Sequence, residues 1–257
     1  VMQTLLDERK VIKGIYQNRE EIEVKLRSWI GGLANVFFIA AEAGSGKTNL
    51  LVEIQRQYEK RGFNSLLIRA CRMAKNNLKD EICYLLNIDS KRDLSDYKNL
   101  IQTKEEPIFI LIDGINESHD EQKIWGDIKE ISKSFEPGLI KFVVTCRVNS
   151  KNDLDRFNII SFENNIYSEN NEDTKQLSDT AFWLTPLNMI ELEGAWNTYI
   201  TKNKKTTNPQ FKFKDIADYD RSLYEKIKNP LILRIFLETY HNKPLPKKGR
   251  KKLKIWR

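Results

Sequence analysis

Apolar runs and helical patterns alternate along the first half of the chain, and each kind has its own spacing. Four short apolar runs, typical of buried strands, occur at residues 36–40, 65–70, 108–112 and 140–145. The stretches between them show helical periodicity instead. Because this alternation is typical of β-α units that wind a parallel sheet, we expect an α/β fold with helices flanking a parallel sheet.

Helices are predicted around these runs and again near the end of the chain. The periodic stretches before and among the strands are residues 19–29, 48–61, 78–86, 94–102 and 121–133. A polar stretch at residues 149–178 is typical of a surface excursion, and residues 182–187 are expected to form a fifth strand. Helical spacing returns at residues 192–200, 216–228 and 230–240. These last helices predict a small C-terminal helical lid.

The composition is that of an ordinary globular protein. Of the 257 residues, 40% are hydrophobic and 31% are charged, which suits one large domain with a small helical annex. No apolar run is long enough to cross a bilayer, so no membrane partner is expected. The cysteines Cys71, Cys83 and Cys146 lack the spacing of a zinc site or a disulfide framework, which favours a reducing, cytoplasmic setting.

The net charge of +7 is unevenly distributed. Residues 244–257 carry seven Lys and Arg residues and no acid. Such a run fits a solvated linker to a further domain, the interpretation we favour, or a contact with nucleic-acid phosphates. Because the chain begins at Val1 and stops directly after this run, we expect a fragment of a longer protein.

The strongest chemical signal is the segment AEAGSGKT at residues 41–48, between a predicted strand and a predicted helix. It matches the phosphate-binding P-loop pattern, with Ala41 in place of the first glycine. Lys47 would place a cation on the β- and γ-phosphates of ATP or ADP, and the Thr48 hydroxyl would ligate Mg²⁺. The predicted nucleotide-contacting residues of this loop are Ala43, Gly44, Ser45, Gly46, Lys47, Thr48 and Asn49.

The next apolar strand ends in Asp113, within the segment IFILIDGINES. A carboxylate at this end of the strand can hold magnesium beside the P-loop, as a Walker-B aspartate does. Many related ATPases have a glutamate directly after it, whereas here Gly114 follows. Glu117 is therefore the candidate that positions the attacking water; alternatively, it only begins the next helix near its positive end.

The fourth strand ends in VVTCR, with Thr145 and Arg147. Ligands of open α/β sheets bind beyond the carboxyl ends of the strands, so both side chains are expected to face the nucleotide. Arg147 would act with Lys47, Asp113 and Glu117 in catalysis, by bonding the terminal phosphate and distinguishing ATP from ADP. A surface arginine without a role is the alternative.

These segments resemble the STAND family of P-loop NTPases, in its NACHT-like branch of innate-immunity and bacterial antiviral ATPases. The likeness rests on YQNREEI, AEAGSGKT, IFILIDGINE, VVTCR and, more weakly, KNPLILRIF. It implies that Pro230 lies over the adenine and that Arg19 is on the adenine side. Asn116 stands where the family usually has an acid, and Asn18 where it has glycine. The resemblance further implies a switch that hydrolyses ATP slowly. In its ATP-bound state the switch would form a homo-oligomer.

The resemblance also suggests how the chain is divided. Residues 1–30 would be an N-terminal helical segment, residues 31–187 a P-loop NTPase core, and residues 188–257 the helical lid with a basic tail. A nucleic acid or protein trigger would act through regions outside this chain. A nucleic-acid-dependent AAA+-type loader or motor is the alternative function. A nucleotide kinase or small GTPase is a weaker third hypothesis, because the sequence contains no guanine-reading N-K-x-D pattern.

Overall fold

The computed structural model describes most of the chain, in several stretches. These are residues 19–91, 94–97, 107–136, 138–154, 166–167, 180–202, 212–240 and 243–244. Two compact units are present: the first runs from Arg19 to Thr185, and the second from Pro186 onward. The turn Gly44–Gly46 is grouped with the second unit. Residues 1–18 and the basic run after residue 244 lie outside the described residues, so the predictions for them are untested.

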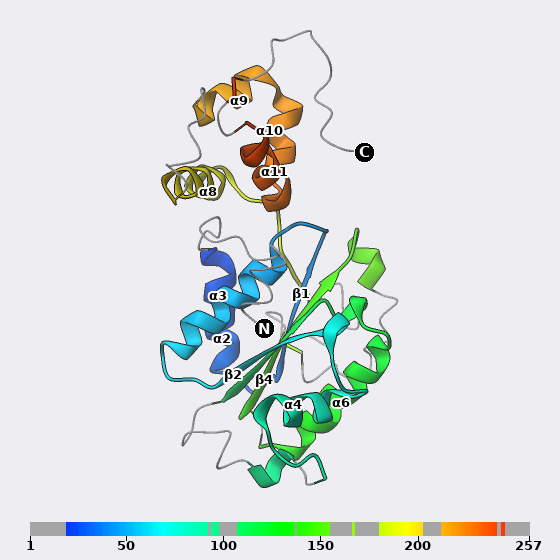
Figure 1. Ribbon diagram of the computed structural model, residues 1–257. Helices are drawn as coiled ribbons and strands as arrows, with labels where there is room; N and C mark the ends of the chain where they lie inside the picture. Colours follow the sequence, from blue (N-terminus) through cyan, green and yellow to red (C-terminus); the bar gives the residue numbers. More distant parts are fainter. Residues whose placement is uncertain are drawn as a thin grey trace. The chain divides into compact units, whose positions relative to one another are not determined.

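A five-stranded sheet forms the centre of the first unit (Figure 1), and each pair of neighbouring strands is parallel. The strands are β1 (Val36–Ala41), β2 (Ser65–Arg69), β3 (Ile108–Asp113), β4 (Ile140–Arg147) and β5 (Phe182–Trp183). Their order is β2-β3-β4-β1-β5. Because β4 lies between β1 and β3, the carboxyl ends of these three strands meet at one edge of the sheet.

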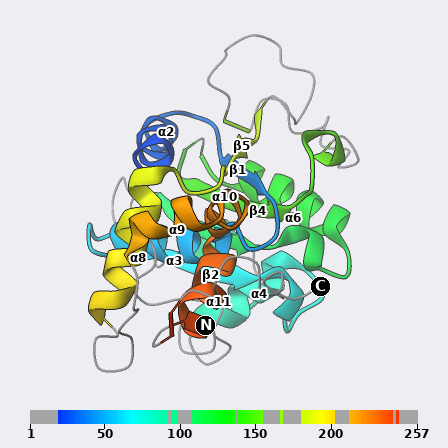
Figure 2. The ribbon, with the colours of Figure 1, turned by 90° about the horizontal axis from the view of Figure 1, so that it is seen from above.

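Helices cover both faces of this sheet, as Figures 1 and 2 show. Among the described residues of this unit, the α-helices are α2 (Glu20–Ile30), α3 (Lys47–Glu59), α4 (Leu78–Leu86) and α6 (Glu121–Ser134). Helices α2 and α3 lie on one face, and α4 and α6 on the other. This arrangement is an α/β fold with helices on both faces of a parallel sheet, and it confirms the predicted fold class.

The strands are mostly apolar because both faces of the sheet are covered, as in other parallel sheets. Along β1, Phe38 packs in the cluster that contains Trp125 of α6, with ring centroids 5.5 Å apart. The next residue back, Phe37, contacts Trp29 of α2 on the opposite face, at 5.5 Å. Burying side chains of this size contributes about 1.5–3 kcal/mol each. Because successive side chains of β1 point to opposite faces of the sheet, this strand packs against both helical layers.

Lys141 is a buried lysine inside β4, with none of its side chain exposed. Its Nζ donates hydrogen bonds to the carbonyl oxygens of Trp29, Gly32 and Ala34, at 3.2, 2.7 and 2.8 Å. These carbonyls lie at and after the C-terminal end of α2, where a cation is favourable. Lys141 therefore fixes the end of α2 to the sheet.

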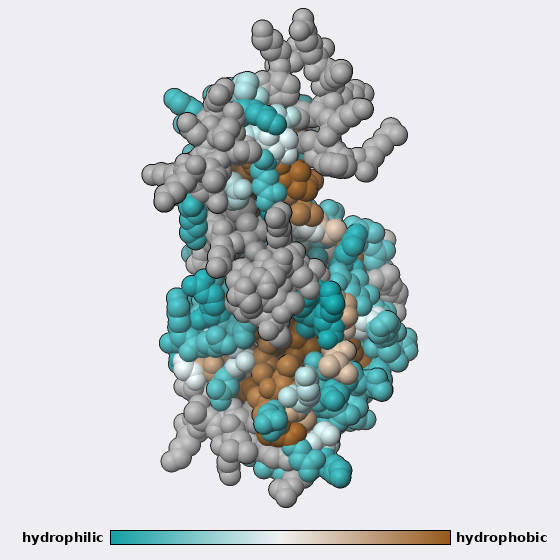
Figure 3. Space-filling view, viewed as in Figure 1, coloured by the Kyte–Doolittle hydropathy of each residue, from teal (hydrophilic) through white to brown (hydrophobic). Residues whose placement is uncertain are grey.

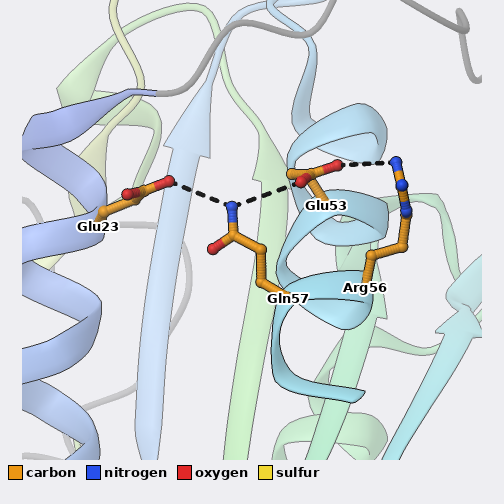
Figure 4. A network of polar contacts seen from close by, with 4 residues as sticks. All are labelled: Glu23, Glu53, Arg56 and Gln57. Carbon is orange, nitrogen blue, oxygen red and sulfur yellow. Dashed lines mark hydrogen bonds and ion pairs between the residues drawn. The ribbon is translucent and has the colours of Figure 1, made fainter. Parts of the chain in front are cut away.

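Helices α2 and α3 are also joined by a polar contact (Figure 4). Gln57 donates to Glu23 at 3.3 Å and to Glu53 at 3.4 Å, and Arg56 pairs with Glu53 at 3.3 Å. Such partly exposed pairs contribute about 0–1 kcal/mol each. They orient the helix that precedes β1 against the helix that follows the P-loop.

The described residues of the second unit form one more helix than the sequence pattern predicts. Its helices are α8 (Met189–Lys202), α9 (Phe213–Tyr219), α10 (Arg221–Ile227) and α11 (Pro230–Tyr240). The expected helix at residues 216–228 is interrupted at Asp220, whose backbone is extended and whose carboxylate accepts from the N–H groups of Ser222 and Leu223 at 2.8 and 3.2 Å. A capping carboxylate starts a new helix there.

Three other predictions need correction in the first unit. The fifth strand covers only Phe182–Trp183. Of the expected helix at residues 94–102, Leu94–Tyr97 form a 3₁₀ helix, and the prediction for residues 98–102 is untested because they lie outside the described part. Within the expected surface excursion, Leu154 and Ile166 are buried, and Ile166 bridges to Val36 of β1. These two apolar residues are therefore part of the core.

Most large apolar side chains of the described residues are interior, and the surface is mixed. On the face in Figure 3, an apolar area of the first unit is bordered by hydrophilic residues. The exposed large hydrophobic side chains are Val24, Leu33, Tyr84, Leu85, Met189, Ile190 and Leu231. Within the described part of the chain, no helix is long and apolar enough to span a membrane.

Candidate functional site

The P-loop connects β1 to α3 at the carboxyl edge of the sheet. Gly44 and Gly46 have φ angles of +75° and +94°, a left-handed conformation that favours glycine. Successive residues in such turns direct their backbone N–H groups into a concave nest that binds anions. Helix α3 begins at Lys47, so its positive N-terminal end lies directly after the nest. The loop therefore has the backbone shape that a phosphate group requires.

Lys47 lies partly buried at the start of α3. Its Nζ donates to the carbonyl oxygens of Ala41 and Glu42, at 3.0 and 2.7 Å. Burial lowers the pKa of Lys47 from 10.5 to about 8, although the negative charge of Asp113 opposes the shift. Arg147 also lowers this pKa and Glu117 raises it. All three charged groups therefore act electrostatically on the ammonium of the P-loop.

Asp113 is held by two hydroxyl groups at the end of β3. Thr48 Oγ1 donates to Asp113 Oδ2 at 2.8 Å, and Thr145 Oγ1 donates to Asp113 Oδ1 at 3.2 Å. Thr145 also accepts from the N–H of Gly114 at 2.9 Å. Hydroxyl and carboxylate oxygens are the ligands that Mg²⁺ prefers, so the Thr48–Asp113 pair fits magnesium. Within the described residues, no group of three or more His, Cys, Asp and Glu side chains gathers as a further metal site.

Thr145 corrects one sequence expectation. It was expected to face the nucleotide, but its side chain is fully buried. The hydroxyl bonds to Asp113 and Gly114 because β4 and β3 are neighbours at this edge. Thr145 therefore orients the carboxylate that would hold the metal.

Glu117 ends a 3₁₀ turn, η3 (Ile115–Glu117), that follows β3. Gly114 has a φ of +69° and turns the chain out of the strand, and the N–H of Glu117 donates to its carbonyl at 2.8 Å. A methyl group on Gly114 would lie 3.3 Å from Cδ of Glu117. The glutamate side chain is exposed and folded back over the residue after Asp113. The side chain of Glu117 therefore lies next to Gly114, the residue that follows Asp113 where many related ATPases have a glutamate.

Arg147 is exposed at the end of β4. Its backbone N–H donates to Oδ1 of Asn116 at 2.7 Å, and the N–H of Val148 donates to the carbonyl of Ala41 at 3.1 Å. The same carbonyl accepts from Lys47. The end of β4 is therefore fixed on one side to the P-loop strand and on the other to η3.

The remaining predicted contacts lie at different places in the chain. Arg19 is buried, and its Nη1 donates to the carbonyl of Thr185 at 2.6 Å. Ala43 is exposed, Ser45 is buried, and Asn49 is partly buried in the first turn of α3. Pro230 is the buried first residue of α11 in the second unit. Their nucleotide contacts stay predictions.

Two contacts of the site were missed from the sequence. The bond from Thr145 to Asp113 and the bond from Arg147 to Asn116 both join β4 to the end of β3. The only sequence signal for them was a polar residue at the end of each strand, which does not specify its partner. Cys71, Cys83 and Cys146 are free thiols in this structure.

Comparison with known protein families gives no match to this sequence, and comparison with curated proteins gives none. Among solved structures, Aeropyrum pernix ORC1 in complex with DNA is similar at 13% identity and a TM-score of 0.49, over 88% of this chain. AMPPCP-bound DnaA from Aquifex aeolicus is 14% identical, with a TM-score of 0.46 over 87% of this chain. C. elegans PCH-2 is 12% identical, with a TM-score of 0.39 over 79%. This chain covers 61%, 67% and 53% of those chains, respectively.

Proposed function

We propose that this protein binds ATP with Mg²⁺ at the P-loop and hydrolyses it. The observation that carries the proposal is the hydrogen bond between Thr48 and Asp113, 2.8 Å long, beside Lys47. It brings the two predicted metal-binding oxygens together from segments far apart in the sequence. A glycine turn without a ligand would not require this carboxylate, hydroxyl and cation in one place.

Binding would begin with the phosphates of ATP. The N–H groups of residues 44–48 would donate hydrogen bonds to the phosphate oxygens in the nest. Lys47 would leave the carbonyls of Ala41 and Glu42 for the β- and γ-phosphate oxygens. This exchange replaces two neutral acceptors by charged ones. The phosphate charge also offsets the burial that lowers the pKa of Lys47.

Magnesium would be held by Thr48 Oγ1 and, directly or through water, by Asp113, and it would neutralise charge on the β- and γ-phosphates. Thr145 keeps the Asp113 carboxylate in orientation while the Thr48 hydroxyl turns to the metal. Glu117, folded back over Gly114, would accept a proton from the attacking water. Arg147 would bond the γ-phosphate, because β4 ends between the strand of the P-loop and the strand of Asp113.

The finer function that we propose is a nucleotide switch of STAND type, in which ATP and ADP favour different states and ATP permits homo-oligomerisation. Support comes from the motifs and from the electrostatic effect of Arg147 on Lys47 within one chain. A role in innate or antiphage defence is part of this proposal. None of the comparisons names a STAND protein.

A nucleic-acid-dependent AAA+-type ATPase is the second candidate. The observation in its favour is the net charge of +7 with the acid-free basic run near the end of the chain. The two candidates differ in what should stimulate hydrolysis. Nucleic acid should raise the turnover of a loader or motor, and the rise should fade with salt, whereas a switch should be insensitive to it.

Calorimetric titration of the full chain with ATP and Mg²⁺ tests the ATP site. We expect Lys47→Ala to weaken ATP binding about a hundredfold, because the phosphates lose a charged donor. The matched control is Lys60→Ala, which changes an exposed lysine just after the opposite end of α3. Equal affinity of Lys47→Ala and wild type would refute the P-loop assignment.

A second titration separates the candidate functions. Arg147→Ala should lose the preference for ATP over ADP and keep its ADP affinity, because only the terminal phosphate loses a partner. An unchanged preference in the isolated chain would contradict a sensor within the same subunit.

A further inference from the structure

Strand β4 extends further than its neighbour β3 at the edge that carries the site. The last registered pair of the two strands is Ile112 with Val144, and β4 continues to Arg147. Strand β3 ends at Asp113, where Gly114, with a φ of +69°, turns the chain away. The β3 side of Arg147 therefore has no strand carbonyl opposite it.

Asn116 supplies the acceptor that the strand lacks. Its Oδ1 lies 2.7 Å from the backbone nitrogen of Arg147. The assignment of the amide is unambiguous, because a backbone N–H can only donate and only the side-chain oxygen can accept. Asn116 is partly buried and belongs to η3, the turn that also carries Glu117. Asn116 therefore links Arg147, which would bond the γ-phosphate, to the turn that carries Glu117, which would accept a proton from the attacking water.

We propose that Asn116 is a positioning residue that sets Arg147 and Glu117 together, so that recognition of the γ-phosphate and placement of the water are coupled. This inference rests on the proposed function of the site. Asn116 touches neither phosphate nor water in this mechanism. It acts through the end of β4 on one side and through η3 on the other.

The chemistry of the amide explains why an uncharged acceptor suits this place. Asp113 and Glu117 are already close along the chain, and Lys47 is affected by both charges. A third carboxylate would keep the hydrogen bond to Arg147 but add negative charge where the γ-phosphate binds. An alanine would remove the acceptor and leave a backbone N–H without its partner.

Removing the acceptor should have a signature that differs from simple destabilisation. With Arg147 and Glu117 less well placed, the preference for ATP over ADP and the turnover number should both fall. The affinity for ADP depends on the P-loop and should persist. If Asn116 had only a structural role, its substitution would instead lower the affinities for ATP and ADP equally and would lower the midpoint of thermal unfolding.

The test compares full-chain wild type with Asn116→Ala and Asn116→Asp, with Asn76→Ala as control. Asn76 is an exposed asparagine in the loop before α4. Calorimetry gives the ATP and ADP dissociation constants, and a steady-state assay gives kcat and KM. We expect Asn116→Ala to reduce the ATP preference and kcat about tenfold each, with ADP affinity unchanged. Asn116→Asp should restore the preference to within about threefold, because it keeps the acceptor.

The outcomes separate this inference from the proposed function. If wild type binds no ATP, the proposed function fails and the inference fails with it. If wild type binds ATP and Lys47→Ala does not, an Asn116→Ala variant with wild-type preference overturns the inference alone. Equal loss of ATP and ADP affinity, or an Asn116→Asp variant as impaired as Asn116→Ala, overturns it too.

Discussion

The affinity for ATP should fall as the pH rises above about 8, because Lys47 loses its proton in the free protein. Burial lowers the pKa of this lysine from 10.5 to about 8. Bound phosphates would raise the pKa again, since nearby negative charge favours the ammonium. Binding above this pH must therefore include the uptake of one proton.

The expected magnitude follows from the fraction of Lys47 that is charged. At about pH 7 roughly nine tenths of the free protein carries the ammonium, and at about pH 9 roughly one tenth does. The apparent dissociation constant should therefore rise about tenfold between these values, and by close to tenfold for each further unit of pH until the bound lysine itself loses its proton. The terminal phosphate does not confuse this trend, because a phosphate monoester with a second pKa of about 6 is fully ionised by about pH 8.

The assay is calorimetry at several pH values, each in two buffers with different ionisation enthalpies. The difference between buffers gives proton uptake directly, which should be about one half near pH 8 and close to one by about pH 9. Binding is a better readout than stability. Burial lowers the pKa of Lys141 to about 8 as well, so both lysines affect the stability in the same pH range. Between about pH 8 and 10.5 the unfolded chain binds more protons than the folded one. The free energy of unfolding should therefore rise with pH there, and the contributions of the two lysines cannot be separated.

Lys141 lies at the opposite end of β4 from Arg147, roughly 20 Å away at about 3.3 Å per residue. Its titration should therefore leave ATP affinity unaffected. Lys47→Arg is the informative variant, because arginine stays charged to above about pH 12. Any ATP binding that this variant retains should be independent of pH between about 7 and 9.5. A wild-type affinity that is flat over the same range, without proton uptake, would refute the reasoning.

Three further results are expected from single substitutions. Glu117→Gln should keep ATP binding and lower turnover by about a hundredfold, because the amide cannot accept a proton, and turnover at the wild-type rate in a phosphate-release assay would place the base elsewhere. Thr145→Val should lower the free energy of unfolding, measured in urea, by about 1–3 kcal/mol, because Asp113 loses a hydroxyl donor. It should also raise the Mg²⁺ concentration that hydrolysis requires. An unaltered magnesium requirement would contradict an orienting role. Lys141→Met should cost about 2–4 kcal/mol in the same urea measurement, because three carbonyls after α2 lose their donor, and a neutral substitution would show that the helix end does not depend on it.

The sequence was a good guide where a local pattern determines local structure. Runs of apolar residues predicted the first four strands, and helical spacing predicted α4 with its observed bounds, because both depend on residues within a short window. Prediction was wrong where one side chain interrupts a pattern. Asp220 is one of several polar residues in a periodic stretch, and its capping bonds divide the expected helix into α9 and α10.

The candidate site was likewise predicted from the sequence only in part. The P-loop needs particular residues at fixed spacing, so the sequence by itself determined the nest, Lys47, Thr48 and the candidacy of Asp113 and Glu117. The order β2-β3-β4-β1-β5 is a property of the whole chain, and no local pattern specifies that β4 lies between β1 and β3. That order alone brings Thr145 onto Asp113 and Asn116 onto Arg147, because side chains at the ends of adjacent strands meet only once the strands have paired.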